Sequence, residues 1–379
     1  MINRNGISAI IVFLALCAQG HAQAHFEVKS EKENFTVRRL LGELSRPWSL
    51  AFLPGGQFLI TERTGSLLLV AEDKIRHIKG VPNVAATGQG GLLDAVLSPH
   101  YERDSLVYLS FSEEESGLYG VAVARGRLTG LSGPSPRLSG VETLYRAYPK
   151  SRGGLHFGSR MSFDEEGYLY ITLGERGSMN RAQDPHDPCG SVLRLNPDGS
   201  IPPDNPYASD KTGGAPEVWS YGHRNAQGMA RHPLTGEIWL HEHGPKGGDE
   251  VNIVKKAANY GWPKATHGIN YDGSIISEIT GAPGITGPVI HWTPSIAPSG
   301  LAFYDGRLFP SWSGNIFVGA LAGKHLRRLE LRGDTVIHQE VLLKNSVGRI
   351  RDVRTGPDGY IYFLTDSVRG ALYRLEPAG

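Results

Sequence analysis

Short runs of alternating apolar and polar residues recur along most of this chain. Each run holds a hydrophobic pair, a turn rich in Pro, Asp or Gly, and a second strand-like apolar segment. Alternation with a period of two residues predicts β-strands, and Pro, Asp or Gly between two such runs predicts a tight turn. The pattern occurs six times, in copies that begin at Trp48, Ala95, Met161, Met229, Leu301 and Val353.

Six copies spaced by roughly 45 to 80 residues favour a six-bladed β-propeller, an all-β ring of four-stranded antiparallel blades. In such a ring successive blades bury each other's faces, and few long strand edges stay exposed. A sandwich of two sheets would not require one turn motif in six copies. We therefore predict a single propeller domain over residues 25–379. Two longer connections, residues 177–215 and 266–294, are predicted as insertions on one face.

The first 24 residues have the pattern of a secretory signal peptide. Arg4 supplies a positive charge, residues 9–18 form an apolar run, and Ala22-Gln23-Ala24 is a cleavage site of the small-x-small kind. The mature chain would then begin at His25. The bacterial style of this signal predicts export to the periplasm.

Composition narrows the possible functions by exclusion. The chain has 379 residues with 40% hydrophobic and 20% charged residues, enough for a sizeable core. Its net charge of +1 gives no electrostatic basis for binding nucleic acid or an acidic membrane. Beyond the signal no apolar run is long enough to span a bilayer, so we predict no stable membrane insertion. Signal cleavage would leave Cys189 as the only cysteine, and hence no internal disulfide.

Two polar, glycine-rich loops on either side of one predicted strand concentrate the candidate chemistry. They cover residues 221–228 and 241–252, and the strand between them ends at Leu240. The loops carry a guanidinium, several amides, three imidazoles and three carboxylates, which are costly to bury unpaired. Two tight surface turns would explain only the glycines. Because loops on a rigid scaffold often carry function, we favour a binding or catalytic site here.

Other polar positions precede the repeated strands, and the sequence leaves their roles open. Gln89 stands in a glycine-rich loop that could equally be a simple turn. His156 is either a structural histidine or a group that accepts a proton near neutral pH. Arg349 and Arg351 would share one face of a strand. They form either a fork for a carboxylated or phosphorylated ligand or a surface pair bridged to an acid such as Asp352.

Two kinds of metal site are compatible with the second loop. His241 and His243 could place two imidazoles on one face for zinc or copper. The main-chain carbonyls of Gly244 and Pro245, together with the Glu250 carboxylate, suit calcium better, since calcium prefers oxygen ligands. The third ligand of a zinc site would be His223, Asp249 or Glu250.

Four motifs, taken together, carry a resemblance to a known family. They begin at Gly222, His243, Asn259 and Arg349 and read GHRNxQG, HGPxGGDEVN, NYGWP and RIRDV, where x is any residue. In combination they resemble the soluble pyrroloquinoline-quinone-dependent aldose sugar dehydrogenases, the glucose/sorbosone dehydrogenase family. The resemblance covers essentially the whole mature chain, and the family fold is a six-bladed propeller.

The resemblance implies a site for pyrroloquinoline quinone (PQQ) and two calcium ions. His156 would be the general base, and Gln89 would contact the quinone near the reacting centre. The other implied cofactor positions are Arg224, Asn225 and Gln227 at the reactive side, Arg349 and Arg351 at the carboxylates, and Tyr271, Ala320, Leu321 and Ala322 along the wall. The implied calcium positions are the carbonyls of Gly244 and Pro245 at the quinone, and Glu250 and Tyr260 at a second, structural ion.

The implied reaction is oxidation of the anomeric carbon of an aldose sugar to a lactone. Hydride would pass to the quinone while His156 removes the hydroxyl proton. Electrons would then leave for a periplasmic acceptor, a quinone or a redox protein, because the chain has no Cys-x-x-Cys-His haem motif. We expect a monomer or a homodimer.

Two positions depart from the glucose-specific branch of this family. Leu155 precedes the base where that branch resembles an Asp-His pair, so the carboxylate that orients His156 would have to come from elsewhere. A cofactor-binding lysine of that branch falls at Ala322, and Lys324 lies two residues away. The first departure affects base strength and sugar preference, and the second implies fewer charge contacts to the cofactor.

Two other functions compete with the dehydrogenase. A calcium-dependent hydrolase, such as a propeller lactonase, would polarise a carbonyl with the metal and activate water with His156. It gives no joint role to Arg224, Arg349 and Arg351. A non-catalytic propeller that binds a protein or a glycan would instead require exposed aromatic patches.

Overall fold

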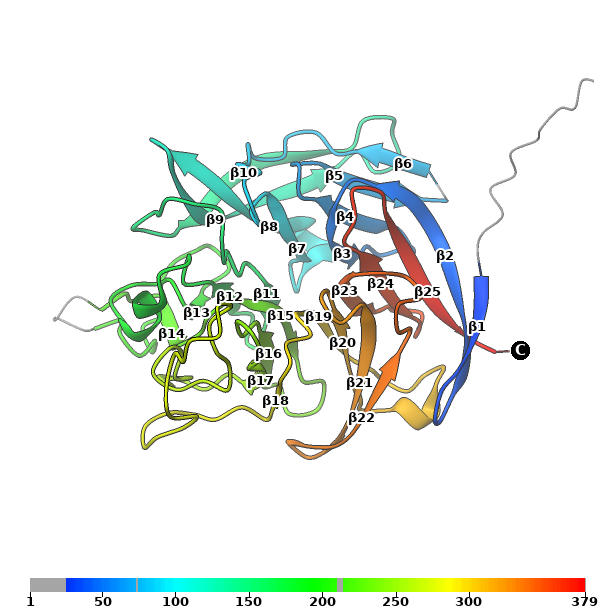
Figure 1. The fold of residues 1–379 in the computed structure, drawn as a ribbon. Coiled ribbons are helices and arrows are strands. Elements are labelled where there is room, and N and C mark those ends of the chain that lie inside the picture. Colours follow the sequence, from blue (N-terminus) through cyan, green and yellow to red (C-terminus); the bar gives the residue numbers. More distant parts are fainter. Residues whose placement is uncertain (1–24, 73, 210–213, 379) are drawn as a thin grey trace, which may run out of the picture.

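The computed structural model describes residues 25–72, 74–209 and 214–378, which form a ring of six antiparallel β-sheets (Figure 1). The prediction of an all-β, six-bladed propeller is confirmed. None of the helices in the described part of the chain is long and apolar enough to cross a membrane. The predicted signal peptide, residues 1–24, lies outside the described residues.

Five of the blades have four strands each, arranged in chain order. The first blade consists of β3 (Pro47–Phe52), β4 (Phe58–Glu62), β5 (Leu67–Ala71) and β6 (Lys74–His77). The second consists of β7 (Leu92–Leu97), β8 (Leu106–Glu115), β9 (Leu118–Thr129) and β10 (Arg137–Arg146). The third consists of β11 (Met161–Phe163), β12 (Leu169–Leu173), β13 (Ser191–Leu195) and β14 (Val218–Tyr221). The fourth consists of β15 (Ala226–Arg231), β16 (Ile238–Glu242), β17 (Asp249–Ile253) and β18 (Ile290–Trp292). The fifth consists of β19 (Pro298–Phe303), β20 (Ile316–Ala320), β21 (His325–Arg332) and β22 (Thr335–Leu342).

The sixth blade joins the two ends of the chain and so closes the ring. Its order is β1-β2-β25-β24-β23, with β23 (Ile350–Thr355), β24 (Ile361–Thr365) and β25 (Gly370–Pro377) from the C-terminal part. The N-terminal strands β1 (His25–Lys29) and β2 (Asn34–Leu44) complete it, and β2 pairs antiparallel with β25. This blade therefore has five strands, one more than predicted, because β1 adds to its outer edge.

The six predicted sequence copies become the first two strands of the six blades. Their second strands carry near-continuous apolar runs, and all five residues of β12, β20 and β24 are buried. A strand with a neighbouring blade on each face has no solvent-facing side, so its sequence loses the alternation of a half-buried strand. The outermost strand β22 keeps more exposed positions.

The prediction that residues 177–215 and 266–294 are only insertions was wrong in part. The first segment contains a 3₁₀ helix, η1 (Met179–Gln183), and the blade strand β13; the second ends with the blade strand β18. The other helical turns are α1 (Tyr101–Asp104) and η2 (Pro310–Trp312). Cys189 is buried and forms no disulfide.

Candidate active site

A cavity of about 430 Å³ is lined by residues from all six blades, which places it on the axis of the ring. Five of the predicted cofactor residues line it: Gln89, Gln227, Leu321, Arg349 and Arg351. The lining residues that sequence reasoning did not name as candidates are Arg46, Trp48, Arg63, Leu93, Phe157, Gly158, Ala297 and Asp366, and His243, considered only as a metal ligand, also lines the cavity. Most of these lie at or next to the ends of the first two strands of the blades, positions that form a common wall only when the ring closes.

Positive charge dominates this cavity. Its lining includes the guanidinium groups of Arg46, Arg63, Arg349 and Arg351 and the single carboxylate of Asp366. Burial lowers the pKa of Arg63, and the nearby Arg351 lowers it further. The excess of cationic groups suits a ligand that carries several carboxylates.

Arg349 and Arg351 point to the same carboxylate, although the sequence left their partner open. Nη2 of Arg349 lies 3.1 Å from Oδ2 of Asp366, and Nη2 of Arg351 lies 3.0 Å from the same oxygen. The acid suggested from sequence, Asp352, pairs instead with Arg160 and Arg354. The two guanidiniums thus form one fork at the cavity wall.

His156 is buried beside the cavity and paired with an acid that the sequence did not identify. Its Nδ1 lies 2.9 Å from Oε1 of Glu175, and its main-chain N–H donates to Oε1 of Gln89 at 2.9 Å. His156 does not itself line the cavity, but its neighbour Phe157 and Gln89 do. With Nδ1–H held by Glu175, Nε2 is the ring nitrogen that can accept a proton.

Glu175 supplies the carboxylate beside His156 that position 155, a leucine, does not provide. It follows β12 directly, in the segment Gly174-Glu175-Arg176-Gly177. Its main-chain N–H donates to the carbonyl of Arg224 at 3.0 Å, which ties this loop to the next blade. The sequence signal that could have identified Glu175 is the pair of charged residues between two glycines at the end of a strand.

The loop around His156 is held in an unusual backbone conformation. His156 has a φ of 48°, in the left-handed region that non-glycine residues seldom adopt. Arg176 donates to the carbonyls of Leu155 and Gly153 and lies 3.4 Å from the ring centroid of Phe157. These contacts fix the loop on both sides of His156.

Asn225 and Gln227 connect this loop to the fourth blade. Oδ1 of Asn225 accepts the N–H of Gly158 at 3.1 Å, and Nε2 of Gln227 donates to the Gly158 carbonyl at 3.2 Å. Oε1 of Gln227 also accepts from Arg351 at 3.3 Å. Gln227 therefore lies between the histidine loop and the arginine fork, and Asn225 supports the loop from outside the cavity.

Arg224 is buried and directed at the loop that was predicted to bind calcium. Its Nη1 donates to the carbonyls of Gly244 at 3.0 Å and His243 at 3.2 Å, while its Nε has no hydrogen-bond partner. Its main-chain N–H donates to Oε2 of Glu242 at 2.6 Å. The other oxygen of Glu242 lies 2.7 Å from Nδ1 of His223. A cationic group thus faces the predicted calcium ligand Gly244.

Glu250 and Tyr260, the predicted ligands of the second calcium, line a small pocket together with Glu242 and Gly244. Pro245 is not among the residues that line it. Burial and, next, the nearby Glu242 carboxylate raise the pKa of Glu250 to about 8. The buried Glu242 carboxylate, the partly buried Glu250 carboxylate and a main-chain carbonyl are an oxygen-rich set that fits a hard cation.

The zinc or copper alternative has weaker support. Nε2 of His241 lies 3.0 Å from the carbonyl oxygen of Gly300, and Nε2 of His243 lies 2.8 Å from that of Pro298. Within residues 25–72, 74–209 and 214–378, no group of three or more His, Cys, Asp or Glu side chains could hold a metal ion. Both imidazoles are thus engaged with the backbone of the next blade.

Three predicted wall residues lie apart from the cavity. Tyr271 is 73% exposed, Ala322 is exposed in a turn, and Ala320 is buried in β20; none of them lines the cavity. Lys324, the neighbour considered as a substitute for the missing lysine, also lies outside it. These positions remain predictions.

Comparisons with known proteins agree with the geometry. The Glucose / Sorbosone dehydrogenase family model matches residues 44–374. The aldose sugar dehydrogenase YliI of Escherichia coli (strain K12) is 45% identical over 347 residues, covering 90% of this chain and 92% of that protein. A solved structure of the soluble aldose sugar dehydrogenase from Escherichia coli, in the apo form, has a TM-score of 0.86 at 43% identity and covers 91% of this chain and 100% of that one. The PQQ-bound aldose sugar dehydrogenase from Streptomyces coelicolor has a TM-score of 0.74 at 29% identity, covering 90% and 98%.

Proposed function

Because the chain belongs to the Glucose / Sorbosone dehydrogenase family and is therefore an oxidoreductase, we propose that it oxidises the anomeric carbon of aldose sugars to lactones in the periplasm. The proposed cofactors are PQQ and calcium. The observation that carries the proposal is the buried His156–Glu175 pair beside a cavity walled by arginines. The product, the calcium ions, the electron acceptor and the location are all part of the proposal.

The residues around the cavity fit a quinone with three carboxylates. Arg349 and Arg351 form a fork at one wall, and Arg46 and Arg63 add positive charge. Nε of Arg351 at the cavity wall is buried without a hydrogen-bond partner, and so is Nε of Arg224, which lines the small pocket beside Glu250; each guanidinium thus retains a donor. An unsatisfied buried donor is costly, and a bound polyanion would remove that cost.

PQQ, when bound, would supply the hydride acceptor, and calcium at the Gly244 and Pro245 carbonyls would favour the negative charge that develops on it. Arg224 is directed at Gly244 and adds a second cationic group at this end of the site. Glu250 and Tyr260 would hold the second calcium, where a cation would lower the repulsion between Glu250 and Glu242.

His156 would act at the sugar hydroxyl. Its Nε2 takes the proton of the anomeric hydroxyl as the C–H bond breaks, and the two electrons of that bond leave as hydride. The C–O bond becomes the carbonyl of the lactone. Glu175 keeps the imidazole in the correct tautomer and stabilises its charged form, as an acid does for a base histidine in other enzymes.

The test is reconstitution of the purified protein with PQQ, with and without calcium. Glucose, a pentose and a disaccharide would be offered with a reducible dye. We expect dye reduction to require both additions and to fall about 10²- to 10⁴-fold in His156→Ala. His186→Ala, at an exposed histidine, is the matched control and should retain activity.

Failure of the wild-type protein to bind PQQ at micromolar concentration with calcium present would overturn the proposal. Lactone hydrolysis without PQQ would then favour the hydrolase alternative. Absence of both activities would favour the non-catalytic binding propeller.

A further inference from the structure

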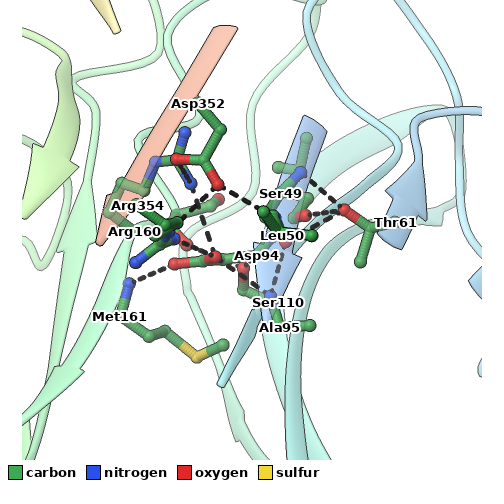
Figure 2. Close-up of polar contacts among 12 residues, drawn as sticks. Ser49, Leu50, Thr61, Asp94, Ala95, Ser110, Arg160, Met161, Asp352 and Arg354 are labelled. Atoms are coloured by element: carbon green, nitrogen blue, oxygen red, sulfur yellow. Dashed lines mark hydrogen bonds and ion pairs between the residues drawn. The ribbon is translucent and has the colours of Figure 1, made fainter. Parts of the chain in front are cut away.

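A buried cluster of two arginines and two aspartates joins the inner strands of the propeller (Figure 2). Nη1 of Arg160 lies 3.1 Å from Oδ1 of Asp352 and 3.4 Å from Oδ1 of Asp94. Arg354 contacts both acids too, at 3.0 and 3.1 Å. The side chains of Arg160, Asp94 and Asp352 are at most 1% exposed. Two cations and two anions make the cluster formally neutral.

Arg160 is the member of this cluster that touches the wall of the cavity. Its Nε donates to the carbonyl of Gln227 at 2.7 Å, and its Nη2 donates to the carbonyl of Arg351 at 3.2 Å. Its guanidinium also lies 3.9 Å from the ring centroid of Trp48. Gln227, Arg351 and Trp48 all line the cavity, and they come from three different blades.

The two acids hold Arg160 in place and anchor further strands. Oδ2 of Asp94 accepts the main-chain N–H of Met161 at 2.9 Å, and Oδ2 of Asp352 accepts that of Leu50 at 2.9 Å. Figure 2 shows Arg160 and Arg354 grouped around the carboxylates of Asp94 and Asp352, to which Met161 and Leu50 also donate. One guanidinium is thereby fixed relative to the first, second, third, fourth and sixth blades.

Stability alone does not explain such a cluster. Replacing a buried ion pair with apolar residues of similar volume is often neutral or stabilising, because desolvating the charges costs as much as their attraction gains. An arginine, by contrast, can donate several hydrogen bonds in fixed, coplanar directions. That property matters where distances between separate elements have to be kept.

We propose that Arg160 is a positioning residue of the cofactor cavity, setting the spacing of Gln227, Arg351 and Trp48 across the ring axis. This inference rests on the proposed function, since it assigns Arg160 a part in quinone binding. Arg160 itself touches neither cofactor nor substrate. It acts through the two carbonyls and the indole ring that it contacts.

The test is Arg160→Lys, compared with Arg328→Lys as a matched control. Lysine retains the positive charge but cannot reach both carbonyls and both acids at once. Arg328 is also fully buried, between Glu340 and Asn315, but none of the residues that it contacts lines the cavity. The dissociation constant of PQQ would be measured by quenching of tryptophan fluorescence, and Tm by circular dichroism, each in the presence of calcium.

We expect both variants to lower Tm, and Arg160→Lys alone to weaken PQQ binding, by about tenfold or more. Equal PQQ affinity, within twofold, in wild type, Arg328→Lys and Arg160→Lys would overturn the inference and leave the proposed function intact. If the wild-type protein does not bind PQQ, the proposed function fails and the inference fails with it.

A second variant covers the case in which Arg160→Lys does not fold. Asp94→Asn keeps an acceptor for the Met161 N–H but removes one charge that orients Arg160. The Asp94 side chain forms no hydrogen bond or ion pair with a cavity-lining residue. We expect Asp94→Asn to weaken PQQ binding by a smaller factor than Arg160→Lys does. Unchanged PQQ binding in folded Asp94→Asn would likewise overturn the inference.

Discussion

At the scale of single residues, the pairing of charges decides what the cavity can do. His156 gains an acid partner from Glu175, and Arg349 and Arg351 share Asp366. Each partner lies at least 15 residues away in the chain. The two predictions at this scale therefore concern the acids.

Replacing Glu175 with Gln should lower kcat by about 10²-fold, because the amide neither stabilises a charged imidazole nor fixes its tautomer reliably. PQQ binding should stay close to wild type, since Glu175 does not line the cavity. Steady-state kinetics with saturating PQQ, together with a fluorescence titration, measures both quantities. Glu175→Asp should recover part of the rate, and a kcat equal to wild type in Glu175→Gln would contradict the assigned role.

Asp366 should contribute to stability in a pH-dependent way. Burial favours its neutral form, but Arg351 and then Arg349 outweigh this and lower its pKa to about 2. A carboxyl whose pKa is lower in the folded state stabilises the fold above its unfolded pKa, and this contribution is lost as the pH falls through the folded value. The contribution, about 2 kcal/mol, should thus be complete above about pH 4 and disappear towards pH 2.

Denaturant unfolding of wild type and Asp366→Asn between about pH 5 and pH 2 tests this expectation. The free energy of unfolding of the wild type should fall more steeply with acidification than that of the variant. Parallel curves for the two proteins would show that Asp366 is not the group responsible.

At the scale of elements, close contact between a loop and a strand end fixes the position of His156, the proposed base. Gly174, at the end of β12, lies against the main chain of His156, and a Cβ at Gly174 would collide with the His156 carbonyl. The same Cβ would lie 3.0 Å from Oδ1 of Asn225. Only glycine leaves room for the His156 loop at this strand end.

Gly174→Ala should therefore displace the His156 loop and reduce kcat by at least about tenfold, since small misplacements of a catalytic group have large effects. Gly167→Ala is the matched control, because a Cβ there meets nothing within 4 Å. It lies in the same blade and should lower Tm only modestly through its positive φ. Wild-type kcat in folded Gly174→Ala would contradict the expectation.

At the scale of the whole molecule, the ring is closed by strands from opposite ends of the chain. Phe35 in β2 is fully buried and packs edge-on against Trp312, with ring centroids 5.5 Å apart. It also contacts Phe309 of the fifth blade. The N-terminal strand is thus held both by pairing with β25 and by this aromatic cluster.

Phe35→Ala should lower the free energy of unfolding by about 3 to 5 kcal/mol, the usual cost of emptying a buried aromatic site. PQQ affinity should not change, because Phe35 does not line the cavity. Urea unfolding and the PQQ titration together separate the two effects. A stability loss below about 1 kcal/mol would show that closure does not depend on this contact.

The sequence by itself determined the repeat and therefore the fold class. Turn residues between paired apolar runs depend on local backbone preferences, so the six copies could be recognised without knowing their neighbours. It also singled out Gln89, Gln227, Arg349 and Arg351, which all line the cavity, but a cofactor role for them was implied only by the resemblance that the four motifs carry.

Only the tertiary structure decided which of these side chains meet. Glu175 joins His156, Asp366 joins the arginine fork, and Arg160 reaches two other blades, all through contacts between segments far apart in the chain. The fifth strand of the closing blade, β1, was not predicted either, although it pairs with β2, its neighbour in the chain. The physical reason is that hydrophobic periodicity reports the environment of one strand, whereas a site on the ring axis depends on the distances between blades.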